Sequence, residues 1–279
     1  MSSGYWQQVV STGLGVPEDR PLDELTVELT AMLGSPDPAQ RDGIAYPALA
    51  TWIEKGTYDH LLGGLGDGIA EGLLNGLGDT DGTSVFRRSF SALVLAECIA
   101  RDTVAGLLPA AKVLAWGDRL AGWFLRERDT RGWVEGHGWA HAVAHGADAI
   151  GQLGASRHLG VPELTVMLDV LADRITDAGT PPLLAGELDR MAAATCVILR
   201  RNLVPLSVVE PWVARVAAAA RTAGRRGDPY AGTTNAEGYL RSLYLHVELA
   251  PPAPAIRSDL LLTLVEALRS TNPYTLGPS

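Results

Sequence analysis

Residues 131–150, RGWVEGHGWAHAVAHGADAI, are the stretch from which the rest of the chain is interpreted. They hold three of the six histidines and two of the seven tryptophans. Gly132, Gly136 and Gly138 lie near the start, where glycine permits unusual backbone angles. Apolar residues then recur at helical spacing, which predicts a helix over 136–153 entered through a glycine-rich turn.

Helical patterns continue on both sides of this segment. Leu and Ala are abundant, aromatic residues make up 6% of the chain, and no stretch alternates with a period of two. This composition favours helices, because Ala and Leu lose little conformational freedom in them. Besides 136–153, we expect helices over about 22–33, 38–55, 58–77, 84–101, 104–128, 163–177, 185–203, 206–223, 234–249 and 253–270.

The 58–77 segment is unusually rich in glycine, with six glycines between Gly63 and Gly76. Each glycine costs about 1 kcal/mol relative to alanine inside a helix. Such a helix needs tertiary packing, and its glycines let a neighbour approach closely. The alternative is that the segment breaks into two short helices.

About ten helices without a strand predict an all-α fold with no sheet. Short turns between antiparallel helices are typical of an α-solenoid or helical array. No strict repeat of 34 or 40 residues is visible, so we expect a degenerate, HEAT-like array. No long linker divides the sequence, which predicts a single domain over residues 1–279.

Charge and cysteine content exclude several classes of protein. The net charge of −9 disfavours nucleic acid as a partner, including the role of a helical DNA-repair module. No secretory signal and no apolar run of membrane-spanning length is present, so we expect a cytoplasmic protein without a membrane partner. Cys98 and Cys196 lie in apolar stretches, which predicts buried free thiols.

The histidines of the central segment form a polar stripe if the segment is helical. Projected at about 100° per residue, His137, His141, His145 and Asp148 fall within about 80° of one another. Apolar side chains occupy the opposite face of the same projection. The spacing therefore predicts one surface that carries three imidazoles and a carboxylate.

Three interpretations of this stripe remain open. A histidine near neutral pKa can act as a general base, with Asp148 fixing the tautomer of His145. Alternatively, His137 and His141, or His141 and His145, hold one divalent metal with ligands from elsewhere. Thirdly, the stripe is a polar helix face without chemistry. The sequence leaves the cofactor undecided between none and one divalent metal.

Other candidate residues each have a structural alternative. Trp133 forms a pocket wall with Glu135 as a polar contact, or it only covers the helix entry. Arg87 and Arg88 begin an apolar helix, where a cation is unfavourable, so we expect a carboxylate or an anionic ligand nearby. On a later helix, Glu237, Arg241 and Tyr244 share one face; Glu237 and Arg241 form either a structural ion pair or part of a site.

Three stretches, Ser84–Leu93, Arg131–Asp148 and Leu240–Tyr244, resemble a bacterial domain-of-unknown-function family, number 2785. The similarity extends from about residue 20 to residue 250, and its core is Trp-Ala-His-x-x-x-His-x-x-Asp at 139–148. The resemblance implies a helical fold and marks the residues of this core. Lysine is common at position 137 of the pattern, which makes His137 the least secure member of the stripe. The family implies no reaction.

We therefore expect an enzyme of hydrolase- or lyase-like chemistry that acts on a small, oxygen-rich molecule. The alternative is a non-catalytic helical-repeat scaffold that binds a peptide or protein. The oligomeric state is not predicted. The expected catalytic residues are His141, His145, Asp148 and Glu135, and the expected ligand-binding residues are Trp133, His137, Trp139, Arg88, Arg241 and Tyr244.

Overall fold

The computed structural model describes residues 3–221 and 232–276. Within these ranges the regular secondary structure is helical apart from one two-stranded hairpin, so the predicted all-α class is confirmed. The contacts divide the chain into two compact units, Met1–Ala149 and Ile150–Ser279, each described here by itself. The single domain expected from the sequence stays a prediction.

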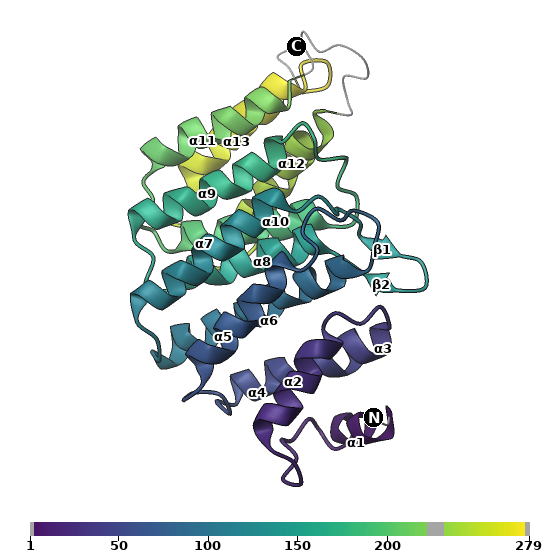
Figure 1. Ribbon diagram of the computed structural model, residues 1–279. Helices are drawn as coiled ribbons and strands as arrows, with labels where there is room; N and C mark the ends of the chain where they lie inside the picture. The colour runs from purple at the N-terminus through teal and green to yellow at the C-terminus, as the bar shows by residue number, and fades with distance from the viewer. Residues whose placement is uncertain (1–2, 222–231, 277–279) are drawn as a thin grey trace. The chain divides into compact units, whose positions relative to one another are not determined.

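The first unit is built around its longest helix, α6 (Ser84–Ala105), which packs against α4, α5 and η2 (Figure 1). Thirteen side chains of α6 are buried, which explains its apolar sequence. The helix α1 was not predicted. The other elements of this unit are α1 (Ser3–Ser11), α2 (Leu22–Met32), α3 (Pro38–Gln40), η1 (Arg41–Ala45), α4 (Tyr46–Glu54), α5 (Leu62–Glu71), η2 (Gly72–Leu74), α7 (Ala110–Arg126), β1 (Trp133–Val134), β2 (Gly138–Trp139) and the first half of α8 (Ala142–Ala155).

The predicted helix over 38–55 is present, but it contains a π-helical turn. Asp37 caps it as expected, since its carboxylate accepts the Ala39 N–H at 2.9 Å. The π turn η1 precedes Pro47, and the Tyr46 N–H donates to the carbonyl of Arg41. Proline has no N–H and its ring crowds the carbonyl four residues earlier. The wider turn lets the helix continue past this proline.

The glycine-rich segment forms neither one helix over 58–77 nor two separate α-helices: it contains the single α-helix α5, followed directly by the 3-10 turn η2. Residues 55–61 form turns, and the helix α5 begins only at Leu62. The predicted close approach is found at Gly66, where an added Cβ would lie 2.2 Å from the ring of Trp116. This glycine is therefore required by packing against α7.

The predicted helix over 136–153 and the predicted absence of strands are wrong at residues 133–141. Trp133 pairs with Trp139 and Val134 with Gly138 in an antiparallel hairpin, and α8 begins at Ala142. The physical reason is backbone conformation: Gly136, Gly138 and His141 have φ values of 75°, 77° and 47°. An α-helix needs φ near −60°, so no helix can pass through these positions.

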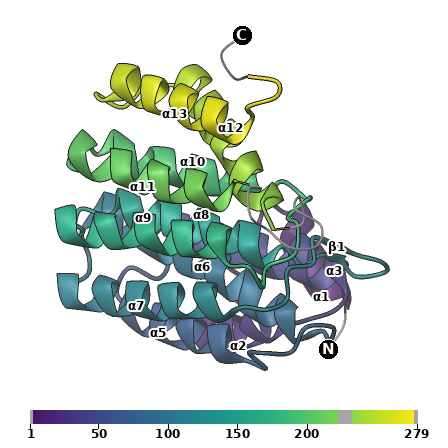
Figure 2. The same cartoon turned by 90° about the horizontal axis from the view of Figure 1, so that it is seen from above.

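The second unit contains helices in two layers (Figure 2). The helices α9, α11 and α13 follow one another, and α10 packs against α12. Between α11 and α9, the Trp212 indole donates to the Leu168 carbonyl at 2.8 Å. The elements are the end of α8, α9 (Val161–Thr176), α10 (Glu187–Arg200), α11 (Leu206–Ala219), α12 (Thr234–Leu249) and α13 (Arg257–Thr271).

Two further properties of the described chain match the sequence. None of its helices is long and apolar enough to span a membrane. Cys98 and Cys196 are free and buried, as predicted. Burial raises the pKa of the Cys98 thiol and raises that of Cys196 to about 11.

Candidate functional site

The hairpin and the start of α8 bring four aromatic rings together, which we call the His-Trp cluster: Trp133, Trp139, His141 and His145. Trp133 and Trp139 lie edge to face with ring centroids 5.2 Å apart. His141 stacks on Trp139 at 4.1 Å, and His145 is 5.8 Å from His141. The two tryptophans are 58% and 41% exposed, although residues of this size are usually covered.

A buried serine of α6, Ser89, contacts the ring of His145. Ser89 is fully buried, and its hydroxyl lies 2.7 Å from Nδ1 of His145 and 2.5 Å from the carbonyl oxygen of Ala140. A carbonyl only accepts, so the single hydroxyl proton of Ser89 goes to Ala140. The hydroxyl oxygen must then accept from Nδ1, which assigns the Nδ1 proton and leaves the lone pair of the neutral ring on Nε2.

Ser89 therefore makes a contact that fixes the tautomer of His145, and the role predicted for Asp148 stays a prediction. Asp148 lies on α8 three residues beyond His145 and is partly exposed, like His141 and His145. The helix α8 begins directly after His141, and the His145 N–H donates to the His141 carbonyl at 2.9 Å. A face shared with Asp148 stays a prediction.

His137 and Glu135 lie in the turn of the hairpin and not on α8, which corrects the four-member helical stripe. Nδ1 of His137 is 3.2 Å from the Pro36 carbonyl oxygen, and its ring lies 6.1 Å from that of Phe86. Glu135 is exposed. Both residues therefore lie on a different element from His145, which is on α8.

The hairpin is anchored by a buried arginine that the sequence pattern does not single out. The Arg41 guanidinium donates to the His137 carbonyl at 2.7 Å and lies over Phe86 at 4.1 Å. It also pairs with Asp42 at 2.7 Å, while burial lowers the pKa of Arg41. Gly138 makes room, since an added Cβ would lie 3.4 Å from the Arg41 Nη2 atom. Arg41 thus joins β2 to the π turn.

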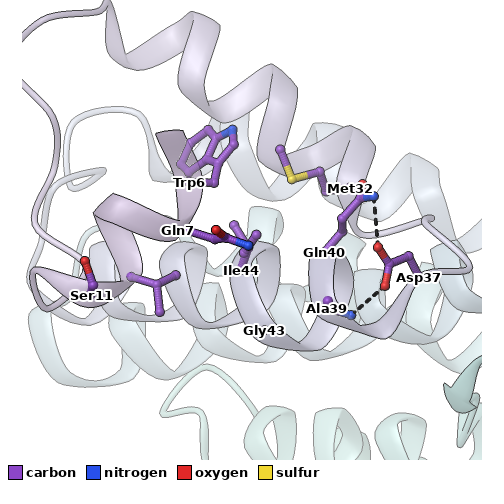
Figure 3. Close-up of a pocket in the computed structure, with 10 residues that line it drawn as sticks. Trp6, Gln7, Ser11, Met32, Asp37, Ala39, Gln40, Gly43 and Ile44 are labelled. Carbon is purple, nitrogen blue, oxygen red and sulfur yellow. Dashed lines mark hydrogen bonds between the residues drawn. The ribbon is translucent and has the colours of Figure 1, made fainter. Parts of the chain in front are cut away.

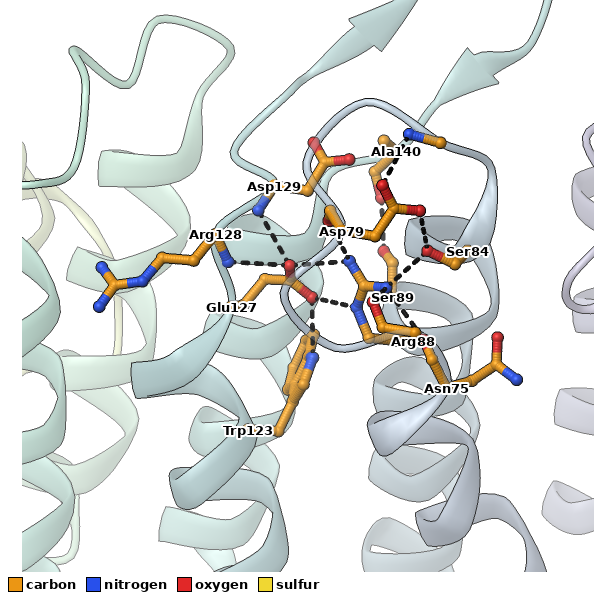
Figure 4. A network of polar contacts seen from close by, with 12 residues as sticks. Asn75, Asp79, Ser84, Arg88, Ser89, Trp123, Glu127, Arg128, Asp129 and Ala140 are labelled. Atoms are coloured by element: carbon orange, nitrogen blue, oxygen red, sulfur yellow. Dashed lines mark hydrogen bonds and ion pairs between the residues drawn. The ribbon is translucent and has the colours of Figure 1, made fainter.

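Arg88 lies in a buried polar network (Figure 4). Its Nε and Nη2 atoms donate to the Glu127 carboxylate at 2.5 and 2.9 Å, and Nη1 donates to the carbonyls of Asn75 and Gly76. We expected either a carboxylate or an anionic ligand near this cation, and the structure shows the carboxylate of Glu127. Glu127 also accepts the Trp123 indole at 2.9 Å. The network connects α6, α7 and the loop before α6.

Arg241 and Tyr244 lie on α12, in the second unit. Arg241 pairs with Glu237 at 2.9 Å and donates to Asn272 at 3.0 Å, so the predicted ion pair is present. Arg241 and Glu237 also border a cavity of about 490 Å³. Tyr244 is half-buried one turn further along the helix.

Another cavity in the first unit contains none of the predicted site residues. It has a volume of about 500 Å³ and is bordered by α1, the end of α2 and the π turn (Figure 3). Trp6 and Ile44 supply apolar walls, and Gln40 is held by the Asp37 carboxylate at 3.1 Å.

Among the residues that the structure describes, no three His, Cys, Asp or Glu side chains form a metal-binding group.

The fold and the His-Trp cluster define an all-α protein with an imidazole site beside an aromatic hairpin. The family described as a protein of unknown function, DUF2785, matches residues 73–245, and the chain belongs to this family. The family suspected from the sequence is therefore confirmed, and the matched region, which includes α6, the hairpin and α8, begins later than the residue 20 expected. No curated protein and no solved structure matches the chain.

Proposed function

We propose that the protein is an enzyme in which His145 acts as general base on a small molecule bound at the His-Trp cluster. The contact between Ser89 and Nδ1 of His145 carries this proposal. A general base needs a fixed tautomer with its lone pair on a defined nitrogen. In this proposal the buried Ser89 fixes the tautomer of His145.

The conformation of His141 supports the same location. His141 has a φ of 47°, in the left-handed region that non-glycine residues rarely adopt. Strained residues of this kind concentrate at ligand-binding and catalytic sites. In the proposal, His141 is the second proton carrier next to His145, and Asp148 is a polar contact on the same side of the chain.

The exposed tryptophans supply a binding surface for the substrate. An exposed aromatic pair is unfavourable in water unless a ligand covers it. Trp133 and Trp139 offer flat and edge surfaces on which a ring stacks, such as that of a sugar or another oxygen-rich molecule. Glu135, in the adjacent turn, is a polar contact for the same ligand.

A panel of p-nitrophenyl esters, phosphates and glycosides tests the proposal. We expect the wild-type protein to hydrolyse at least one class, with a rate that rises as imidazole deprotonates. His145→Gln should lower the rate by at least about a hundredfold, because a general base contributes roughly 10²–10⁴. His60→Gln, an exposed histidine of the first unit, is the matched control. Turnover that is equal in both variants would contradict the proposal.

The exposed tryptophan pair also favours a second candidate, a scaffold that anchors a peptide or protein on this surface. Stacking without proton transfer would then be the whole function. Binding of a random peptide library, read by tryptophan fluorescence, distinguishes the two. A scaffold predicts binding that survives His145→Gln and is lost in Trp139→Ala.

A further inference from the structure

A cleft at the start of α6 carries a cation without a counter-charge. The cleft has a volume of about 740 Å³ and is bordered by the end of α2, by α5 and η2, and by the first turn of α6. Arg87 lies in this first turn and borders the cleft. In the described part of the chain, no carboxylate lies within 4.0 Å of its guanidinium.

The neighbouring arginine, Arg88, has a different environment from Arg87. Arg88 is fully buried and neutralised by Glu127. Arg87 is only half-buried, and the one hydrogen bond found for its guanidinium is from Nη1 to the Thr30 carbonyl. Desolvation lowers the pKa of Arg87 with no opposing contribution from an acid. Of these two adjacent arginines, Arg88 pairs with a carboxylate, whereas Arg87 borders a cleft.

Several hydrogen-bond donors border the cleft besides the Arg87 guanidinium. Thr83 gives the 22-residue helix α6 no side-chain cap, although the Phe86 N–H donates to the Thr83 carbonyl at 3.2 Å. The other N–H groups of the first turn have no acceptor within the helix. The hydroxyls of Thr83 and Ser35 also border the cleft. The Ser84 hydroxyl borders it too, but its proton is already donated to the Asp79 carboxylate at 2.7 Å. Helix amides, hydroxyls and a guanidinium together form the usual environment of an oxyanion.

At the opposite wall, Gly72 lets the Arg87 guanidinium and the Ser91 hydroxyl pack closely against η2. An added Cβ on Gly72 would lie 2.8 Å from Nε of Arg87 and 2.1 Å from the Ser91 hydroxyl oxygen. That hydroxyl is fully buried and has no hydrogen-bond partner. Arg87 and Ser91 therefore converge on a glycine of η2, where a side chain would displace both.

We propose that this cleft binds an oxyanion, a phosphate or carboxylate group, through the Arg87 guanidinium and the first turn of α6. Arg87 supplies the charge and a planar pair of donors, and the helix start supplies amide and hydroxyl donors. Glu71 also borders the cleft and is exposed. Its carboxylate repels the ligand and weakens binding.

Calorimetric titration of the full chain with inorganic phosphate or acetate, at low ionic strength, tests the proposal. We expect saturable binding to the wild-type protein, and the tighter of the two ions identifies the group. Arg87→Gln should bind at least about tenfold more weakly, because a charge-assisted hydrogen bond is lost. Arg119→Gln, which removes an exposed charge from α7, should bind like the wild type.

A third variant separates an oxyanion from a ligand that needs the carboxylate. Glu71→Gln removes a like charge and should bind phosphate as tightly as the wild type or up to about fivefold more tightly. Loss of binding in Glu71→Gln would overturn the proposal. So would unchanged binding in a folded Arg87→Gln, or no saturable binding of either ion by the wild-type protein. Circular dichroism checks folding, and Arg87→Lys replaces Arg87→Gln if the latter is unfolded.

Discussion

Two buried serines of α6 have opposite hydrogen-bonding environments. Ser89 bonds to Ala140 and His145, whereas Ser91 has no partner for its hydroxyl. Ser89→Ala removes both hydrogen bonds and should lower the free energy of unfolding by about 1–3 kcal/mol. Ser91→Ala removes a buried hydroxyl without a partner and should leave the free energy of unfolding unchanged or raise it by up to about 1–3 kcal/mol. Urea denaturation measures both; equal losses would contradict this account.

The sequence predicts some site residues better than others. Histidines and tryptophans at 133–145 stand out because these residue types are rare elsewhere in the chain. Ser89 and Arg41 do not stand out. A serine on an apolar helix face resembles any small core residue, and the pattern around Arg41 resembles a solvated helix. Their roles come from contacts with residues 56 and 96 positions away, which local sequence cannot encode.

At the scale of the elements, α5 contains glycines with contrasting surroundings. Gly66 faces the buried ring of Trp116, while a Cβ on Gly68 would meet nothing within 4 Å. Gly66→Ala should lower the free energy of unfolding by about 1–3 kcal/mol through overpacking. Gly68→Ala should raise it by roughly 0.5–1 kcal/mol, because alanine favours the helix. Thermal denaturation distinguishes them, and two variants of the same sign would refute the packing role of Gly66.

The helices were predictable because apolar residues recur along them at helical spacing. Most observed helix ends agree with the predicted ends to within a few residues. The hairpin was not predictable from periodicity, because two-residue strands are too short to show an alternating pattern. The available signal was chemical: Gly136 and Gly138 flanked by Trp133 and Trp139 are typical of a short hairpin loop with positive φ. The π turn in the helix over 38–54 could be inferred only from Pro47.

Acid should destabilise the molecule through its paired carboxylates. Lys112 lowers the pKa of Asp67, and the Trp116 indole lowers it further. A carboxylate with a lowered folded-state pKa stabilises fully above its unfolded pKa, and this stability disappears as pH falls through the folded value. The stability difference between wild type and Asp67→Asn should therefore be present at pH 7 and shrink below about pH 4. A difference independent of pH would contradict the assignment.

For the whole chain, each unit contains one fully buried cysteine, Cys98 in the first and Cys196 in the second. The helix α8 includes residues of both units, so unfolding of one removes half of a helix from the other. We expect both thiols to become reactive at the same urea concentration, as a single domain requires. Cys98→Ala and Cys196→Ala proteins, labelled with a thiol reagent, report each unit. Separate midpoints would show two independent domains.

The tautomer of His145 tests the central claim most directly. Long-range proton–nitrogen NMR of histidine-labelled protein distinguishes the two neutral tautomers, and the signals lost in His145→Gln assign the residue. This account predicts a protonated Nδ1 and an unprotonated Nε2 at high pH, with the preference lost in Ser89→Ala. A neutral His145 with its proton on Nε2 would contradict the orientation by Ser89 and, with it, the proposed base.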